Sequence, residues 1–212
     1  MNNINILNNY GPTYMFDGCS KLPSVELKNW VFNSNCKDVS FMFRNCTKLE
    51  TADLSGWNTN NVTNLYMMFY GCSSLPSLDL SGWDTSNIYN CSAMFCGCSS
   101  LTALDLSNWN TSKLTSCGGM FQGCSNLVTV DLSNWDISKL GTAGGMFEGC
   151  TSITTLNLSN WKPSTTFNSA TFSLGSIPTT AKIITNQTMA DWLNTRYPSY
   201  TNIEIVKASW EE

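Results

Sequence analysis

The stretch CSSLTALDLSNWNTSKL, residues 98–114, alternates apolar and polar side chains around its centre. Leu104 and Leu106 are separated by a single charged residue, and small or polar residues flank them. Such alternation predicts a short β-strand with one buried and one exposed face. Around this strand the motif LxxLxLxxW runs from Leu101 to Trp109.

The same motif returns along the chain at a fixed period. MFDGCSKLPSVELKNW (15–30) and MFQGCSNLVTVDLSNW (120–135) are two of the copies. The first step between copies is 27 residues and the later steps are 26. A constant period of this size predicts a solenoid, in which each copy forms one coil. The copies start at Met15, Met42, Met68, Met94, Met120 and Met146, and end at Trp30, Trp57, Trp83, Trp109, Trp135 and Trp161.

Each copy is expected to contribute one strand, and all strands run in the same direction. Strands repeated in this way form a parallel sheet. The expected strands are Val25–Leu27, Ala52–Leu54, Leu78–Leu80, Leu104–Leu106, Val130–Leu132 and Leu156–Leu158.

The segment between successive strands is expected to return as a short helix. Asn or Asp after each tryptophan favours a turn. In VTNLYMMF, Val62, Leu65 and Phe69 have helical spacing, and Gly71 is suited to end a helix of one or two turns. The motif matches the leucine-rich repeat pattern LxxLxLxxN/C, with tryptophan in the Asn/Cys position. The predicted fold is therefore α/β: a right-handed leucine-rich-repeat solenoid with a parallel sheet on one face and short helices or turns on the other.

The repeated Trp and Cys residues are interpreted as side chains that fill the interior of the solenoid. Residues one coil apart lie above one another, about 4.8 Å apart, so a side chain that fits once fits in every coil. Burial of one indole contributes about 5 kcal/mol before entropy is counted. A thiol repeated once per coil is interpreted as a small buried residue rather than as a disulfide partner. Cys91 and Cys117, which share a second position, are the best candidates for a bridge. The first column is Cys19, Cys46, Cys72, Cys98, Cys124 and Cys150.

The ends of a solenoid need caps because a terminal coil exposes its apolar interior. Residues 1–14 are expected to form an N-terminal cap, and 15–162 to form the repeats. Residues 163–212 are expected to form a C-terminal cap, made of a degenerate repeat with the strand AKIIT (181–185), an amphipathic helix in NQTMADWLNTRY and a last strand in NIEIVKA.

Composition excludes several classes of function. The formal net charge is −4, only 12% of residues are charged, and histidine is absent. Nucleic acid requires a basic face, and no apolar run approaches the roughly 20 residues of a membrane helix. Without histidine the chain lacks the commonest general base and metal ligand. We therefore expect no nucleic-acid partner, no membrane insertion, no cofactor or metal site, and no enzymatic activity.

MFYGCSSLPSLDLSGWDTSNI (68–88) and MFCGCSSLTALDLSNWNTSKL (94–114) resemble the BspA-like leucine-rich repeat surface proteins. The resemblance covers about 15–167. It implies a cell-surface or adhesive role, with binding to host-matrix proteins or to other cells, and no shared catalytic residues. The family also occurs in phages. Since the chain shows neither a secretion signal nor a wall anchor, a virion component is the alternative.

The outward positions of the strands form the candidate site. In the functional interpretation they build a shallow acidic face that recognises a basic or hydroxyl-rich partner, a protein or a glycan on a cell surface or matrix. Alternatively, the carboxylates only bond neighbouring Ser and Thr side chains, and a calcium site is a third possibility. The row is Glu26, Asp53, Asp79, Asp105, Asp131, Asn157 and Lys182.

Tyr66, Tyr70 and Tyr89 form a second group, around one return segment and its neighbour. Exposed aromatic side chains anchor partners in many interfaces, but here they are also suited simply to cover the convex side. The predicted function is a non-enzymatic, extracellular or cell-surface binding module that acts through its strand face. The alternative is a structural or receptor-binding component of a phage virion, with the solenoid as a spacer or decoration.

Overall fold

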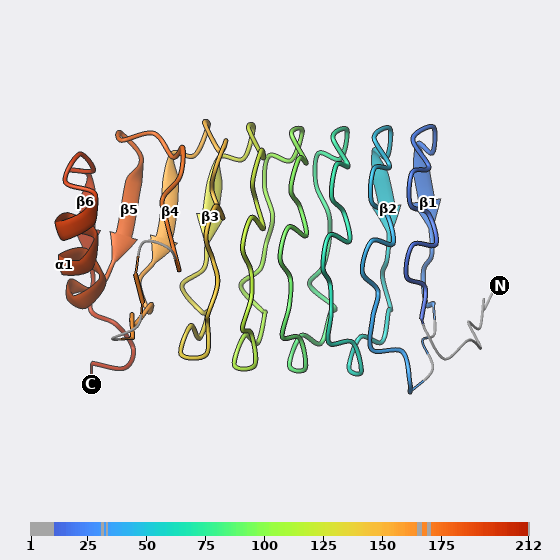
Figure 1. Ribbon diagram of the computed structural model, residues 1–212, viewed down its shortest axis with the longest axis horizontal. Helices are drawn as coiled ribbons and strands as arrows, with labels where there is room; N and C mark the ends of the chain where they lie inside the picture. Colours follow the sequence, from blue (N-terminus) through green and yellow to red (C-terminus); the bar gives the residue numbers. More distant parts are fainter. Residues whose placement is uncertain (1–10, 31, 33, 165–166, 169–170, 212) are drawn as a thin grey trace.

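The computed structural model describes residues 11–30, 32, 34–164, 167–168 and 171–211. In it the chain winds into a parallel solenoid whose coils lie side by side from the N-terminal to the C-terminal end (Figure 1). The predicted leucine-rich-repeat solenoid with a parallel sheet on one side is therefore confirmed. Most of the expected N-terminal cap, residues 1–10, lies outside the described residues.

The strands of the solenoid form two sheets rather than one. β1 pairs with β2, and the order in the second sheet is β3-β4-β5-β6, with all pairs parallel. The elements are β1 Ser24–Glu26, β2 Thr51–Asp53, β3 Thr129–Asp131, β4 Thr155–Leu158, β5 Lys182–Thr185 and β6 Ile203–Ile205.

The strands expected at Leu78–Leu80 and Leu104–Leu106 are not formed. Both segments are described, and neither carries strand pairing. Their alternation is nevertheless correct, since Leu78, Leu80 and Leu106 are buried and Asp79 and Asp105 are exposed. Alternation specifies which side chains enter the core, but it does not specify the distance between backbones on which a hydrogen-bond ladder depends.

The expected helices in the return segments are wrong, because these segments are turns joined to the next coil by hydrogen bonds. Phe69 N–H donates to the carbonyl of Met94 at 2.9 Å, and Phe95 N–H donates to that of Met120 at 2.9 Å. A helix would direct the same groups to carbonyls four residues earlier. Parallel bridges also connect Asp38, Asn64, Asn90, Ser116 and Thr142 in succession. This second ladder continues through the coils where the sheet is interrupted.

One position of the return segment requires a left-handed backbone in every copy. It lies directly before the methionine that opens each copy, and its φ is between +53° and +65° throughout. A residue other than glycine in this region costs roughly 1–2 kcal/mol, because its Cβ approaches the following carbonyl oxygen. The position is held by Tyr14, Phe41, Met67, Ala93, Gly119 and Gly145. We call it the left-handed position.

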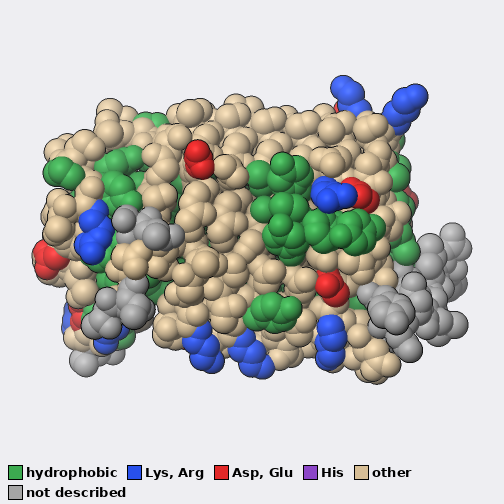
Figure 2. All heavy atoms as spheres, viewed as in Figure 1, with side chains coloured by type: hydrophobic (Ala, Val, Ile, Leu, Met, Phe, Trp, Pro, Cys, Tyr) green, Lys and Arg blue, Asp and Glu red, His purple; other side chains and the backbone are tan. Residues whose placement is uncertain are grey.

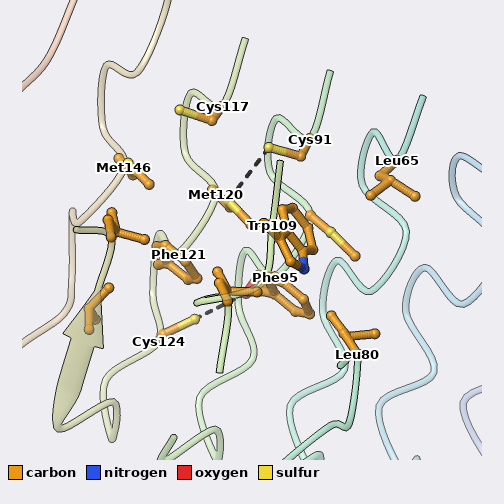
Figure 3. Packing of buried hydrophobic residues seen from close by; sticks show 14 of the residues in the cluster. Leu65, Leu80, Cys91, Phe95, Trp109, Cys117, Met120, Phe121, Cys124 and Met146 are labelled. Carbon is orange, nitrogen blue, oxygen red and sulfur yellow. Dashed lines mark hydrogen bonds between the residues drawn. The ribbon is translucent and has the colours of Figure 1, made fainter. Parts of the chain in front are cut away.

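The interior is filled by columns of identical side chains. Phenylalanines from Phe16 to Phe147 stack in one file, with ring centroids 5.2–6.2 Å apart and interplanar angles of 12° or less. Figure 3 shows Phe95 and Phe121 in successive coils. The predicted tryptophan column is buried, with exposed fractions from 0% at Trp161 to 6% at Trp83. The phenylalanine file, which the sequence motif LxxLxLxxW does not include, is the more continuous stack.

The cysteine column is buried from Cys46 onward and makes a specific contact as well as filling space. Cys124 Sγ donates to the carbonyl of Phe95 at 3.1 Å (Figure 3). Cys98 Sγ donates in the same way to the carbonyl of Phe69 at 3.1 Å. Cys91 and Cys117 are not bridged, and all ten cysteines are free. Removal from water raises the pKa of the buried thiols, to about 11 for Cys46 and about 12 for Cys150.

The C-terminal region covers the last coil. Helix α1, Gln187–Arg196, packs at the end of the stack (Figure 1) and buries Met189, Trp192 and Leu193. Asn186 caps the start of the helix: its side-chain oxygen accepts from Met189 N–H at 2.9 Å and so satisfies a free donor of the first turn. No helix in the described ranges combines the length and apolar character needed to cross a bilayer.

Candidate functional site

The predicted row of outward side chains lies on one open face of the solenoid. Parallel pairing places Glu26 beside Asp53 and Asp131 beside Asn157. Asp79 and Asp105 occupy the same position in the two coils between the sheets, and both are exposed. The structure therefore assembles six members of the row, with the first five acidic.

Lys182 does not belong to this row, because the register of β5 differs from the predicted one. Thr155 is the partner of Lys182, and Asn157 is the partner of Ile184. This register places Ile183, which is fully buried, in the inward column next to Leu156. Burial of this β-branched side chain decides the register and moves Lys182 to the flanking column. There it forms an ion pair with Glu204 of β6.

The aspartates of the row accept hydrogen bonds from the serine two residues later. Asp53 Oδ1 accepts from the backbone N–H of Ser55 at 3.0 Å and from its hydroxyl at 2.6 Å. Asp79 makes the same pair of contacts with Ser81, at 2.9 and 2.7 Å. These bonds favour the ionised form and lower the pKa of Asp53 and Asp79 below the ordinary value. These two carboxylates are therefore ionised at neutral pH.

Each serine contact uses one carboxylate oxygen and leaves the other on the solvent side. Among the described residues, no hydrogen bond reaches Oδ2 of Asp53, Asp79 or Asp105. Asp131 differs, since its Oδ2 accepts from Asn157 Nδ2 at 3.2 Å. Each of these three aspartates therefore bonds its neighbouring serine through one oxygen and presents the other to solvent.

Two shallow hollows lie along the row. One has a volume of about 420 Å³ and includes Asp105, Asp131 and Asn157 in its lining, and the other has about 370 Å³ and includes Asp53 and Asp79. Small side chains such as Ala103 and Thr129 also line the first of these hollows. The face is therefore shaped for contact with an extended surface or chain. No group of three or more metal-ligating side chains converges in the described part of the protein.

A separate cavity of about 570 Å³ lies where the turns after Trp135 and Trp161 meet the C-terminal tail. Trp210 forms part of its wall, and its indole N–H donates to the carbonyl of Asn160 at 3.0 Å. The sequence provides no signal for this cavity, since its wall joins residues 50 positions apart.

The three candidate tyrosines do not form one cluster. Tyr66 contacts Phe41 edge to face, with ring centroids 5.1 Å apart. Tyr70 comes directly after Phe69 of the stacked file, as Arg44 comes directly after Phe43, so it occupies the position of Arg44 in the next coil. Tyr89, 47% exposed, lies in another position, where its N–H bonds the carbonyl of Thr63.

Comparisons with solved structures find leucine-rich repeat proteins. A leucine-rich repeat protein from Eubacterium ventriosum is 24% identical, with a TM-score of 0.40, over 58% of this chain and 30% of the other. The pneumococcal vaccine antigen PcpA is 18% identical, with a TM-score of 0.36, over 92% and 38%. A leucine-rich repeat protein from Bacteroides ovatus is 17% identical, with a TM-score of 0.22, over 90% and 68%. The chain thus spans about a third of the length of the first two proteins.

A search of curated proteins found no match. The model of the family described as "Mycoplasma protein of unknown function, DUF285" matches residues 10–127 and 72–186, which together include most of the chain. The matched ranges include the repeats at 68–88 and 94–114, which resemble BspA-like leucine-rich repeat proteins. The chain belongs to this family of BspA-like leucine-rich repeat proteins.

Proposed function

We propose that this protein is a non-enzymatic binding module that presents its strand face to a macromolecule outside the cell. The observation that carries the proposal is the set of ionised carboxylates of Asp53, Asp79 and Asp105, each held by a serine through one oxygen and open to solvent through the other. The partner is a protein or glycan of a cell surface or matrix that offers cationic or hydroxyl groups at intervals of one coil.

The shape of the face supports contact with a macromolecule. Small-molecule sites are usually concave and bury most of the ligand, whereas the hollows beside Asp79 and Asp105 are shallow and open along the row. An open face with like charges about 4.8 Å apart stores repulsion of about 1 kcal/mol per pair even in water. A basic partner relieves this repulsion on binding, so we expect affinity that falls as salt is added.

The test removes charge from the row and keeps its geometry. In a variant with Asp79→Asn and Asp105→Asn, the amide oxygen still accepts from the serine N–H, so the turn is preserved. A matched control carries Asp84→Asn and Asp136→Asn. These aspartates lie in the turns after the tryptophans, and each accepts from a serine N–H in the same way, at 3.0 and 2.8 Å.

Both variants and the parent protein are applied to arrays of matrix proteins and glycans at low and high salt. We expect the parent to bind at least one class of target, the row variant to bind it several-fold more weakly at low salt, and the control to behave as the parent. Equal binding by the row variant and the parent would show that the strand face is not the binding surface.

A further inference from the structure

The return side of the first coils carries a group of exposed aromatic and apolar side chains. Figure 2 shows hydrophobic side chains gathered on the half of the molecule that contains β1 and β2. The exposed fraction is 50% for Tyr14, and Phe41, Tyr66 and Met67 are partly exposed. We define the aromatic patch by Tyr14, Phe41, Arg44, Tyr66 and Met67.

Contacts between its members hold the patch in one arrangement. Tyr14 and Phe41 stack with centroids 4.4 Å apart and an interplanar angle of 9°. The Arg44 guanidinium lies 4.8 Å from the centroid of Phe41 and 5.5 Å from that of Tyr14. Two hydrogen bonds to Asp17, at 2.8 and 2.6 Å, fix the guanidinium in turn. Few side-chain rotations remain to be lost when a partner binds.

The fold does not need these side chains. Tyr14, Phe41 and Met67 occupy the left-handed position, where Gly119 and Gly145 meet the backbone requirement without strain in later coils. The core below them is made by the adjacent residues, for example Met42 and Phe43, which are fully buried. Strained residues that the surrounding structure supports are concentrated at functional sites. The large side chains in the first three copies thus point to a role at the surface.

We propose that the aromatic patch is a second docking surface, and that it binds an apolar, uncharged surface of another protein. Its composition of Tyr, Phe, Met and Arg is that of the buried centre of protein interfaces. Its one cation is paired with Asp17, so the patch has no net charge to offer to a nucleic acid or an acidic membrane. The stacked rings of Tyr14 and Phe41 cover one another, which leaves fewer open ring faces for sugars.

The test uses variants copied from other coils, so that each residue introduced is one the fold already accepts. Phe41→Gly reproduces Gly119, and Tyr66→Ser reproduces Ser40 and Ser92 at the matching position. Tyr89→Ser is the control, because it removes an exposed aromatic outside the patch. Thermal unfolding of each variant confirms that it is folded, and the two patch variants serve as independent tests.

A display library of random peptides is selected on the parent protein. We expect apolar peptides of low charge, with affinities that fall by roughly tenfold or more in both patch variants, as for loss of a central interface aromatic. The Tyr89→Ser variant and the Asp79→Asn, Asp105→Asn variant are expected to bind these peptides as the parent does. The second of these variants separates this surface from the strand face.

Several results would overturn the proposal. Selection that yields charged peptides or none, or peptides that bind both patch variants normally, would contradict it. Binding to neutral glycans or phosphatidylcholine vesicles that the patch variants lose would assign the patch to sugars or to lipid. Self-association in sedimentation that these variants abolish would assign it to a second copy of the chain.

Discussion

The first three coils and the last three use the left-handed position differently. Tyr14, Phe41 and Met67 hold it in the first half, and Ala93, Gly119 and Gly145 hold it in the second, with φ between +53° and +65° in all six. Backbone hydrogen bonds between coils impose this conformation, so it does not change with the side chain. The comparison shows that the backbone of each coil is set by its neighbours, while outward side chains are free to differ.

The largest expected effect is the loss of stability in alkali. Burial raises the thiol pKa from 9.0 to about 11 for Cys46 and about 12 for Cys150. The folded state therefore retains protons that the unfolded state loses, and each unit of pKa difference corresponds to about 1.4 kcal/mol per thiol. Stability should be complete below about pH 9 and fall as the pH rises through 11 and 12.

Urea unfolding midpoints at pH 8, 10 and 11 measure this loss. Between these pH values the unfolded chain loses the proton of either thiol while the folded protein largely keeps it, so Cys46→Ala and Cys150→Ala should each reduce the fall between pH 8 and 11. Cys150→Ala should reduce it slightly more, because the pKa of that thiol is higher in the folded protein. An unchanged midpoint up to pH 11 would show that the thiols are ionised without penalty in the folded protein.

Inner and outer phenylalanines provide the next contrast. Phe95 is fully buried in the stacked file, and Phe95→Ala should reduce the free energy of unfolding by about 3–5 kcal/mol. Phe41 lies outside the core, so Phe41→Ala should cost less than about 1 kcal/mol. Chemical denaturation of both variants measures the difference, and comparable losses would place Phe41 in the core.

Transfer of a large side chain to the second half isolates the backbone strain. A Cβ at Gly119 would come no closer than 3.5 Å to its nearest neighbour, Gln122 Oε1, so no clash is expected. Gly119→Phe should therefore lose about 1–2 kcal/mol to the strain of the left-handed position and regain part of it because the unfolded chain loses the freedom of glycine, for a net loss of about 1 kcal/mol.

Ala93→Phe is the matched control for this transfer. The position already carries a Cβ at φ +53°, and we expect a change within about 0.5 kcal/mol, as for ordinary surface substitutions. Equal losses for the two variants in denaturant titrations would mean that ring contacts, rather than backbone strain, determine the result.

The smallest effect is expected for Phe41→Gly. Relief of strain in the folded state and the greater freedom of glycine in the unfolded chain, each about 1 kcal/mol, oppose one another. The change should stay within about 0.5 kcal/mol. Tyr66→Gly, at a position without positive φ, should lose stability, and a thermal melt that ranks the two variants in the opposite order would contradict the strain at Phe41.

Sequence periodicity predicted the columns of the core, and the structure shows why it also suggested helices wrongly. Val62, Leu65 and Phe69 are all buried, so their spacing does report one inward side. A run of tight turns places the same residues inside, and periodicity alone does not distinguish the two. A helix and a run of turns differ in the carbonyl that accepts each N–H, and the acceptor for Phe69 is the Met94 carbonyl in the next coil.

The sequence predicted the candidate site only in part, as it did the fold. Alternation around Asp79 and Asp105 was sufficient to place both carboxylates on the open face, where they are found. The serine contacts that occupy one oxygen of each were one of the two main interpretations of the row, whereas alternation did not predict the register that moves Lys182 out of it. The aromatic patch had a signal in the sequence, the large residues before Met15, Met42 and Met68, but their exposure depends on backbone geometry.

By itself the sequence determined the coil, its length and the residues that stack inside it, because a repeat of constant period places identical side chains above one another. The tertiary structure alone decided where the sheet is interrupted, which return segments are turns, and which side chains remain outside. These features depend on hydrogen bonds between residues about 26 positions apart, such as that from Asn64 Nδ2 to Asp38 Oδ2, and local patterns carry no information about such distances.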